Sequence, residues 1–272
     1  MDIKILENER YNRIIGNGSE GTVYDLGEKA LKLFHEDIDF PVLYNKINKL
    51  FLLNQINING VVTPIELMVS DNGTPKGYTM EKIDTLTNMY IFTKSITFSL
   101  EDKIKKLKQM EELIIKIHEN KITLGDMNLF NFLLNVKGEL FAIDTDNYKI
   151  ENYNNDIMPS MGFPYYYENI SSQINENLDK FLFGIYIIRN LTNCDDLRLD
   201  QVLMDLYPNT NYIETYIEAL EVNNEVKDMM IELIKKDGKF FYMPSKLDEM
   251  LPRQYKREKS FIEFKKVQKY YI

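Results

Sequence analysis

The stretch Gly125-Asp126-Met127-Asn128-Leu129-Phe130-Asn131, followed by Ala142-Ile143-Asp144, places two carboxylates and amide side chains at a defined spacing. A carboxylate can accept a proton from a hydroxyl group, and a second carboxylate with an amide oxygen can hold a divalent metal. Asp126 fits the first role, and Asn131 and Asp144 fit the second. Turns and strand ends are also rich in Asp and Asn for local hydrogen-bonding reasons, so this stretch alone is a weak signal.

A glycine-rich turn lies upstream, in the sequence Ile14-Ile15-Gly16-Asn17-Gly18-Ser19-Glu20-Gly21-Thr22-Val23-Tyr24. Its pattern is G-x-G-x-x-G-x-V. In a dinucleotide fold the same glycines open a helix, whereas β-branched and aromatic residues follow the last glycine here. The pattern therefore predicts a strand, a turn and a second strand that cover phosphate groups, because glycine lets the backbone N–H groups approach phosphate oxygens closely.

A third short strand is predicted at Lys29-Ala30-Leu31-Lys32-Leu33-Phe34, with a lysine at its fourth position. One lysine in a strand is usually a solvated side chain. Its order after the glycine-rich turn and before Asp126, Asn131 and Asp144 changes that interpretation. Together these groups indicate metal-dependent phosphoryl transfer from ATP, with Lys32 on the α- and β-phosphates.

From about residue 11 to about residue 191 the chain resembles the eukaryotic-type protein kinase superfamily, as a divergent member with the family's order of motifs. The resemblance implies an α+β, bilobal fold. A small lobe of five antiparallel strands and one helix would span residues 1–82, and a larger, mainly helical lobe residues 83–272, with the ATP cleft between them. Residues 64–70 and 76–81 would be the fourth and fifth strands, joined at Asp71-Asn72-Gly73-Thr74-Pro75, a hairpin signal.

The resemblance also implies ATP with Mg²⁺ or Mn²⁺, and a role for each matching residue. Asp126 would act as the catalytic base, with Lys32 on the phosphates and Asn128 at the position of a catalytic-loop lysine. Met80 would stand at the start of the hinge, where the backbone of Glu81 and Ile83 faces adenine. The implied nucleotide contacts are Gly16, Asn17, Gly18, Ser19, Gly21, Val23, Ala30, Lys32, Met80, Glu81 and Ile83, and the metal contacts are Asn131 and Asp144.

Several further landmarks have structural roles in the family. Ser99-Leu100-Glu101-Asp102 predicts a helix start by a capping box, and apolar residues then recur at helical spacing up to Ile117. His118 ends this helix, and we expect it to cap or pack, since no acid is paired with it in the sequence. Asp179 would brace the catalytic-loop backbone. Glu168 would anchor the segment that faces the substrate.

Three departures from the family bear on function. Residues 40–55 contain no Asp or Glu, so Lys32 lacks the usual helix glutamate, and Glu36, Asp37 or Asp39 is a possible substitute. The sequence Asp144-Thr145-Asp146 replaces Asp-Phe-Gly, and Asp146 would either add a carboxylate to the metal site or serve the local turn.

The third departure is Gly125, which stands where an arginine would contact a phosphate on the activation segment. We therefore expect activity without phosphorylation of that segment. The predicted function is transfer of the ATP γ-phosphate to a protein hydroxyl, by default on serine or threonine. Two alternatives stay open: a small-molecule kinase of the aminoglycoside or choline type, which Gly125 and Asn128 favour, and a nucleotide-binding pseudokinase that acts as a scaffold.

Composition bounds the remaining possibilities. The 272 residues include 44% hydrophobic side chains, one cysteine at position 194, no hydrophobic signal segment and no membrane span, so we expect a cytoplasmic protein. The net charge of −9 argues against nucleic-acid binding. Residues 253–272 carry seven Lys or Arg and two Glu, which gives this tail a net charge of +5. We expect the tail to be a solvated amphipathic helix or, alternatively, a docking surface for an acidic partner.

Overall fold

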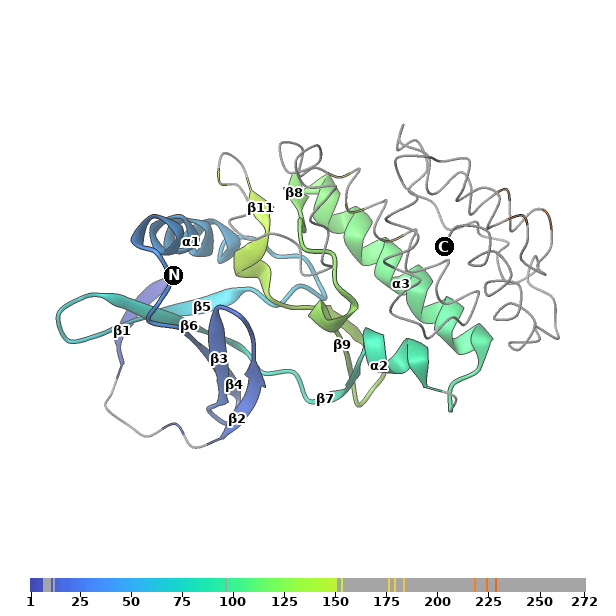
Figure 1. Ribbon diagram of the computed structural model, residues 1–272, viewed down its shortest axis with the longest axis horizontal. Helices are drawn as coiled ribbons and strands as arrows, with labels where there is room; N and C mark the ends of the chain where they lie inside the picture. The colour runs from blue at the N-terminus through green and yellow to red at the C-terminus, as the bar shows by residue number, and fades with distance from the viewer. Residues whose placement is uncertain are drawn as a thin grey trace, which may run out of the picture.

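The computed structural model describes residues 1–6, 11, 13–95, 97–150 and 153, together with six isolated positions between 176 and 228 (Figure 1). These residues form an α+β structure. Glu168, Cys194 and the basic tail 253–272 fall outside the described residues, so their expected roles stay predictions. No helix within the described part of the chain is long and apolar enough to cross a membrane.

The first half of the described chain forms a six-stranded mixed sheet, not the five-stranded antiparallel sheet that was predicted. The strand order is β1-β5-β6-β4-β3-β2. The five predicted strands are present and pair antiparallel. Their bounds are β2 (Ile14–Asn17), β3 (Gly21–Asp25), β4 (Lys29–Phe34), β5 (Pro64–Val69) and β6 (Pro75–Glu81).

The additional strand is β1 (Asp2–Ile5), which pairs parallel to β5 with Ile3 opposite Leu67. All four of its residues are exposed, so its short sequence carries no core-facing pattern. It forms because it supplies hydrogen-bond partners to the edge of β5, which would otherwise be open. An ion pair of 2.5 Å between Lys4 and Glu66 adds to this pairing.

The predicted hairpin between β5 and β6 is present. Gly73 has a φ of +82°, which lies in the left-handed region that glycine tolerates. The Ser70 N–H donates to the Thr74 carbonyl at 2.8 Å and closes the turn.

The single helix of this half, α1 (Phe40–Leu53), lies against the sheet near β1 and β5 (Figure 1). Leu50 packs in a cluster with Leu67, Val69 and Tyr78, which come from β5 and β6. The buried side of α1 also includes two lysines, Lys46 and Lys49. The helix therefore presents positive charge as well as apolar surface toward the interior.

The second half of the described chain is built around one long helix. The helix α3 (Leu100–Glu119) begins at the predicted capping box, in which the Asp102 N–H donates to the Ser99 hydroxyl at 3.1 Å and the Ser99 N–H donates to the Asp102 carboxylate at 3.2 Å. The apolar residues at helical spacing are buried, as predicted: Ile104, Leu107, Met110, Leu113, Ile114 and Ile117.

The rest of this half consists of two small sheets, one short helix and two 3₁₀ turns. A three-stranded sheet has the order β10-β9-β7, and a two-stranded sheet pairs β11 with β8. The bounds of these elements are β7 (Thr85–Asn88), α2 (Met89–Lys94), β8 (Ile122–Thr123), the 3₁₀ turn η1 (Leu129–Asn131), β9 (Phe132–Asn135), β10 (Leu140–Ala142), the 3₁₀ turn η2 (Thr145–Asn147) and β11 (Lys149–Ile150).

The two halves meet where β10 runs beside the segment that precedes β5. The Val62 N–H donates to the Ala142 carbonyl at 2.9 Å, and the Ala142 N–H donates to the Gly60 carbonyl at 2.7 Å. Thr145 extends this contact, because its hydroxyl donates to the Val62 carbonyl at 3.0 Å. Residues 143–147 are therefore fixed next to α1 and the sheet.

Candidate functional site

The glycine-rich turn connects β2 and β3, as the sequence predicted. The Gly18 N–H donates to the Gly21 carbonyl at 2.9 Å and closes the turn. A Cβ on Gly21 would lie 2.5 Å from the Leu33 carbonyl oxygen, so the packing of β3 on β4 requires glycine there. A Cβ on Gly16 or Gly18 would meet only ordinary contacts, at 3.5 and 3.7 Å. Steric crowding within the described residues therefore does not require glycine at these two positions.

The side chains expected around adenine lie on adjacent strands. Ala30 is opposite Met80 in the pairing of β4 with β6, and Val23 is opposite Lys32 in the pairing of β3 with β4. Ala30 is buried, whereas Glu81 is exposed. The Ile83 carbonyl, which was expected to face adenine, accepts a hydrogen bond of 3.0 Å from the Thr85 hydroxyl.

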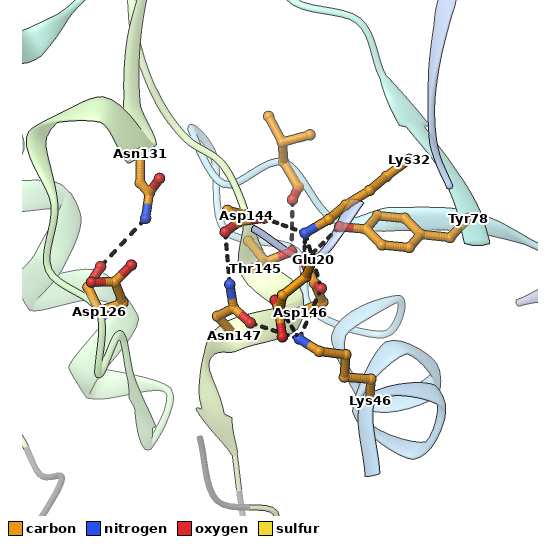
Figure 2. A network of polar contacts seen from close by, with 11 residues as sticks. Glu20, Lys32, Lys46, Tyr78, Asp126, Asn131, Asp144, Thr145, Asp146 and Asn147 are labelled. Carbon is orange, nitrogen blue, oxygen red and sulfur yellow. Dashed lines mark hydrogen bonds and ion pairs between the residues drawn. The ribbon is translucent and has the colours of Figure 1, made fainter. Parts of the chain in front are cut away.

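Lys32 extends from β4 and is only 5% exposed. Its ammonium group donates to the Asp144 carboxylate and to both oxygens of Asp146, at 2.8 and 3.0 Å (Figure 2). Burial alone would lower the pKa of Lys32, but the negative charges of Asp146 and Asp144 outweigh burial and hold this pKa well above its ordinary value. Lys32 is therefore a buried cation with two carboxylate partners.

The partner of Lys32 differs from the expected ones. Neither Glu36 nor Asp37 nor Asp39 forms an ion pair with it in the described part of the chain. The reason is geometric: β4 ends at Phe34, and the acids that follow it lie beyond the inward-facing part of the strand. Asp146 takes the role of partner, two residues after Asp144.

Asp146 is fully buried at the centre of a polar network. Besides Lys32, its carboxylate accepts hydrogen bonds from the Tyr78 hydroxyl at 2.8 Å and from the Lys46 ammonium group at 3.2 Å. Burial would raise the pKa of the Asp146 carboxyl, but the charges of Lys32 and Lys46 lower it far below its ordinary value. Asp146 was expected either to add a carboxylate to a metal site or to serve its local turn. Its side chain instead contacts Lys32, Lys46 and Tyr78, which are all far away in the sequence.

Lys46, like Tyr78 and Asn147, is a residue of this network to which the sequence assigned no role. It projects from α1, is 0% exposed, and donates to the Glu20 carboxylate at 3.0 Å and to the Asn147 side-chain oxygen at 2.7 Å. The available signal was its spacing: Lys46 lies four residues before Leu50 and seven before Leu53, on the buried stripe of the helix. Glu20 comes from the glycine-rich turn, so Lys46 links that turn to residues 146 and 147.

Asp144 has a left-handed backbone conformation, with a φ of +61° and a ψ of +38°. Such a conformation is uncommon for a residue other than glycine. Asn147 holds it from both sides, because its side chain donates to the Asp144 carboxylate at 2.7 Å and its N–H donates to the Asp144 carbonyl at 3.2 Å. Asp144 is thus kept in one orientation by its neighbours.

The catalytic-loop candidates lie on the other side of this network from α1 (Figure 2). The Asn131 side chain donates to the Asp126 carbonyl at 3.4 Å, and the Ile143 N–H donates to the Asn131 carbonyl at 2.9 Å. The second bond joins Asn131 to the residue before Asp144. Asn128, expected to be catalytic, caps η1 through a hydrogen bond of 3.0 Å from the Phe130 N–H to its side-chain oxygen.

Asp179 braces this loop in the manner the resemblance implied. Its carboxylate accepts hydrogen bonds from the N–H groups of Leu124 and Gly125, at 2.8 and 3.0 Å. A third contact of 2.8 Å joins it to the Nε2 atom of His118, which is buried. His118 is thus buried against Asp179, which pairs it with an acid that the sequence did not indicate.

The donor set fits a hard divalent cation such as Mg²⁺ or Mn²⁺. Asp144 has a partly exposed carboxylate whose two oxygens accept hydrogen bonds from Lys32 and Asn147, and the Asn131 side-chain oxygen accepts no hydrogen bond from any described residue. Mg²⁺ prefers such oxygen ligands and is usually held by one or two carboxylates with phosphate oxygens and water. No group of three or more His, Cys, Asp or Glu residues suited to a metal occurs in the described chain.

No protein-family model matches the chain, and no curated protein is found to be similar to it. The residues of the site and their geometry are therefore the basis of the proposed function.

Proposed function

We propose that this protein is a phosphotransferase of the protein kinase type, which transfers the γ-phosphate of ATP to a hydroxyl group of a protein substrate. The observation that carries the proposal is the contact of Lys32 with Asp144, which lie 112 residues apart. This contact joins β4, which follows the glycine-rich turn, to the segment at Asp144, which follows Asp126 and Asn131 in the chain. Phosphoryl transfer requires these parts in one place.

The roles follow from the chemistry of each group. Asp126 would accept the proton of the attacking hydroxyl, and Lys32 would offset negative charge on the phosphates. Asp144 and Asn131 would hold the metal ion, which offsets charge on the phosphate oxygens when bound. The backbone N–H groups of the glycine-rich turn would contact phosphate oxygens, and Asp179 would keep the loop that carries Asp126 in position.

Activity without phosphorylation of the activation segment remains part of the proposal. Gly125 offers no cation that could bind such a phosphate. Tyr148, one of three hydroxyl-bearing residues that would be candidates together with Tyr153 and Ser160, is buried. Burial raises the pKa of its hydroxyl above its ordinary range. This tyrosine is therefore shielded from a modifying enzyme.

The test is transfer of phosphate from γ-labelled ATP, with Mg²⁺ or Mn²⁺, to the protein itself, to a cell lysate and to a set of hydroxylated small molecules. Phosphatase-treated protein is used, so that prior phosphorylation does not contribute. We expect labelled protein bands that Asp126→Asn and Asp144→Ala reduce by about 100-fold or more. The matched control is Asp71→Asn, at an exposed aspartate of the β5–β6 turn, which should keep full activity.

Each other result changes the conclusion. Label on a small molecule and on no protein would replace the proposal with the small-molecule alternative, which Gly125 and Asn128 favour. ATP binding without any transfer would replace it with a nucleotide-binding scaffold. Label that persists in both site variants would show that the assigned residues are not the catalytic ones.

A further inference from the structure

Lys46 is a fully buried lysine whose contacts all lead to the candidate site. Its ammonium group reaches Glu20 at 3.0 Å, Asp146 at 3.2 Å and Asn147 at 2.7 Å. Burial of a lysine is costly unless its charge is paired and hydrogen-bonded. An apolar residue would suit this face of α1 if packing were the only requirement, so the lysine calls for a further explanation.

We propose that Lys46 is a positioning residue of the phosphotransferase site, which holds Asp146 and the glycine-rich turn so that Lys32 is free to contact phosphate. This inference rests on the proposed function. It assigns a role to α1, a helix that carries none of the groups expected to touch ATP or the metal.

Lys46 keeps the charge of Asp146 paired. Its carboxylate is shared by two cations, Lys32 at 2.8 and 3.0 Å and Lys46 at 3.2 Å. If Lys32 were the sole cation, its movement toward a phosphate would leave a buried carboxylate unpaired, which is strongly unfavourable. Lys46 stays on Asp146 in that event. It therefore lowers the energy needed for Lys32 to turn toward the substrate.

Lys46 also holds the glycine-rich turn. Glu20 lies between Gly18 and Gly21, and its side chain is 15% exposed. Its ion pair with Lys46 joins the turn to α1, and through Asp146 and Asn147 to the segment that carries Asp144. The buried Lys46 ammonium group thus sets the position of the turn that would cover the phosphates. Loss of this link is expected to weaken nucleotide binding more than the chemical step.

These two links predict different kinetic effects, which a merely structural residue would not produce. Glu20→Gln removes only the link to the turn, so the KM for ATP should rise about 3- to 10-fold while kcat changes less than about twofold. Lys46→Met removes both links, so kcat should also fall, by about tenfold or more. In an Asp146→Asn background the charge that Lys46 neutralises is absent. There, Lys46→Met should lower kcat by less than about threefold.

The matched control is Lys49→Met, at the other fully buried lysine of α1. We expect it to lower stability without the same dependence on Asp146→Asn. The affinity of each variant for a non-hydrolysable ATP analogue is measured beside the kinetics, and unfolding curves show that each variant is folded. If Lys46→Met does not fold, Glu20→Gln and the double variant Lys46→Met/Asp146→Asn, which removes the charges of Lys46 and Asp146 together, carry the test.

The outcomes separate the inference from the proposed function. An active enzyme in which Lys46→Met and Glu20→Gln keep kcat and KM within twofold would overturn the role of Lys46 and leave the proposed function in place. Equal losses from Lys46→Met in both backgrounds would also overturn it, since they would indicate a structural role. A wild-type protein that neither binds ATP nor transfers phosphate would refute the proposed function, and the inference with it.

Discussion

Alanine substitutions at Gly21 and Gly18 should affect different properties. Gly21→Ala should lower the stability of the protein, whereas Gly18→Ala should weaken nucleotide binding. Gly21 begins β3 and is paired with Phe34 of β4. A Cβ at this position would lie 2.5 Å from the Leu33 carbonyl oxygen, which is 0.9 Å short of the 3.4 Å at which ordinary contacts begin. Because the contacted atom belongs to the backbone, the side chain of a neighbour cannot relieve the clash. The two strands must move apart.

The magnitude follows from two opposing effects. Overpacking that forces backbone shifts costs about 1–3 kcal/mol. Alanine also lowers the entropy of the unfolded chain, which returns about 0.4–1 kcal/mol. Gly21→Ala should therefore lower the free energy of unfolding by about 1–2 kcal/mol. For a chain of this size that corresponds to a drop in Tm of about 2–8 °C.

Gly18→Ala is the matched substitution. The nearest atom to its Cβ would be the Gly21 carbonyl oxygen at 3.7 Å, so the free protein should keep its stability or gain up to about 1 kcal/mol. If the turn binds phosphates through its backbone, the added methyl group should still weaken Mg·ATP binding by about tenfold, because it occupies space next to the ligand. Urea denaturation and isothermal titration calorimetry on both variants measure the two effects separately.

Two results would refute this reasoning. A Gly21→Ala protein as stable as the wild type would show that β3 and β4 are less closely packed than described. Unchanged ATP affinity in Gly18→Ala would show that close backbone approach at this glycine is not needed. In that case the pattern G-x-G-x-x-G would have to be explained by the turn alone.

Two further predictions concern the framework around the site. Hydrogen bonds from Lys4, Lys29 and Thr79 lower the pKa of the Glu66 carboxyl to about 2, so its contribution to stability is complete above about pH 5 and is lost as the pH falls toward 2. Between these pH values Glu66→Gln should lose less stability than the wild type, as measured by urea denaturation; parallel curves would contradict this. Asp179→Ala removes a charged acceptor from two backbone N–H groups of the catalytic loop, and should lower the free energy of unfolding by about 3–6 kcal/mol. A loss below 1 kcal/mol would show that the loop is held by other contacts.

The elements that the sequence predicted correctly are those with local signals. The hairpin at Asn72-Gly73 and the capping box of Ser99 and Asp102 depend on residues within a few positions of one another. β2 and β3 flank the glycine-rich turn that predicted them, whereas β5 and β6 were predicted from the family resemblance together with the hairpin signal. β1 was missed because parallel pairing with a strand some 60 residues away leaves no trace in its own four residues.

The same distinction applies to the candidate site. Lys32 and Asp144 were expected together, because the order of motifs implied it, and the structure brings their side chains into contact. The partners Asp146 and Lys46 could not be paired from the sequence, since 100 residues separate them. Long-range ion pairs depend on how the helix α1 and the turn η2 dock. Periodicity only marked Lys46 as a lysine on a buried stripe.

The strain at Asp144 and the buried charges near it are parts of one arrangement. A left-handed conformation is uncommon at residues other than glycine, although aspartate adopts it more readily than most. Here Lys32 holds one carboxylate oxygen from β4, and Asn147 holds the other. Lys46 in turn holds Asn147 from α1. The orientation of Asp144 therefore depends on a contact from β4, on its own turn and, through Asn147, on α1.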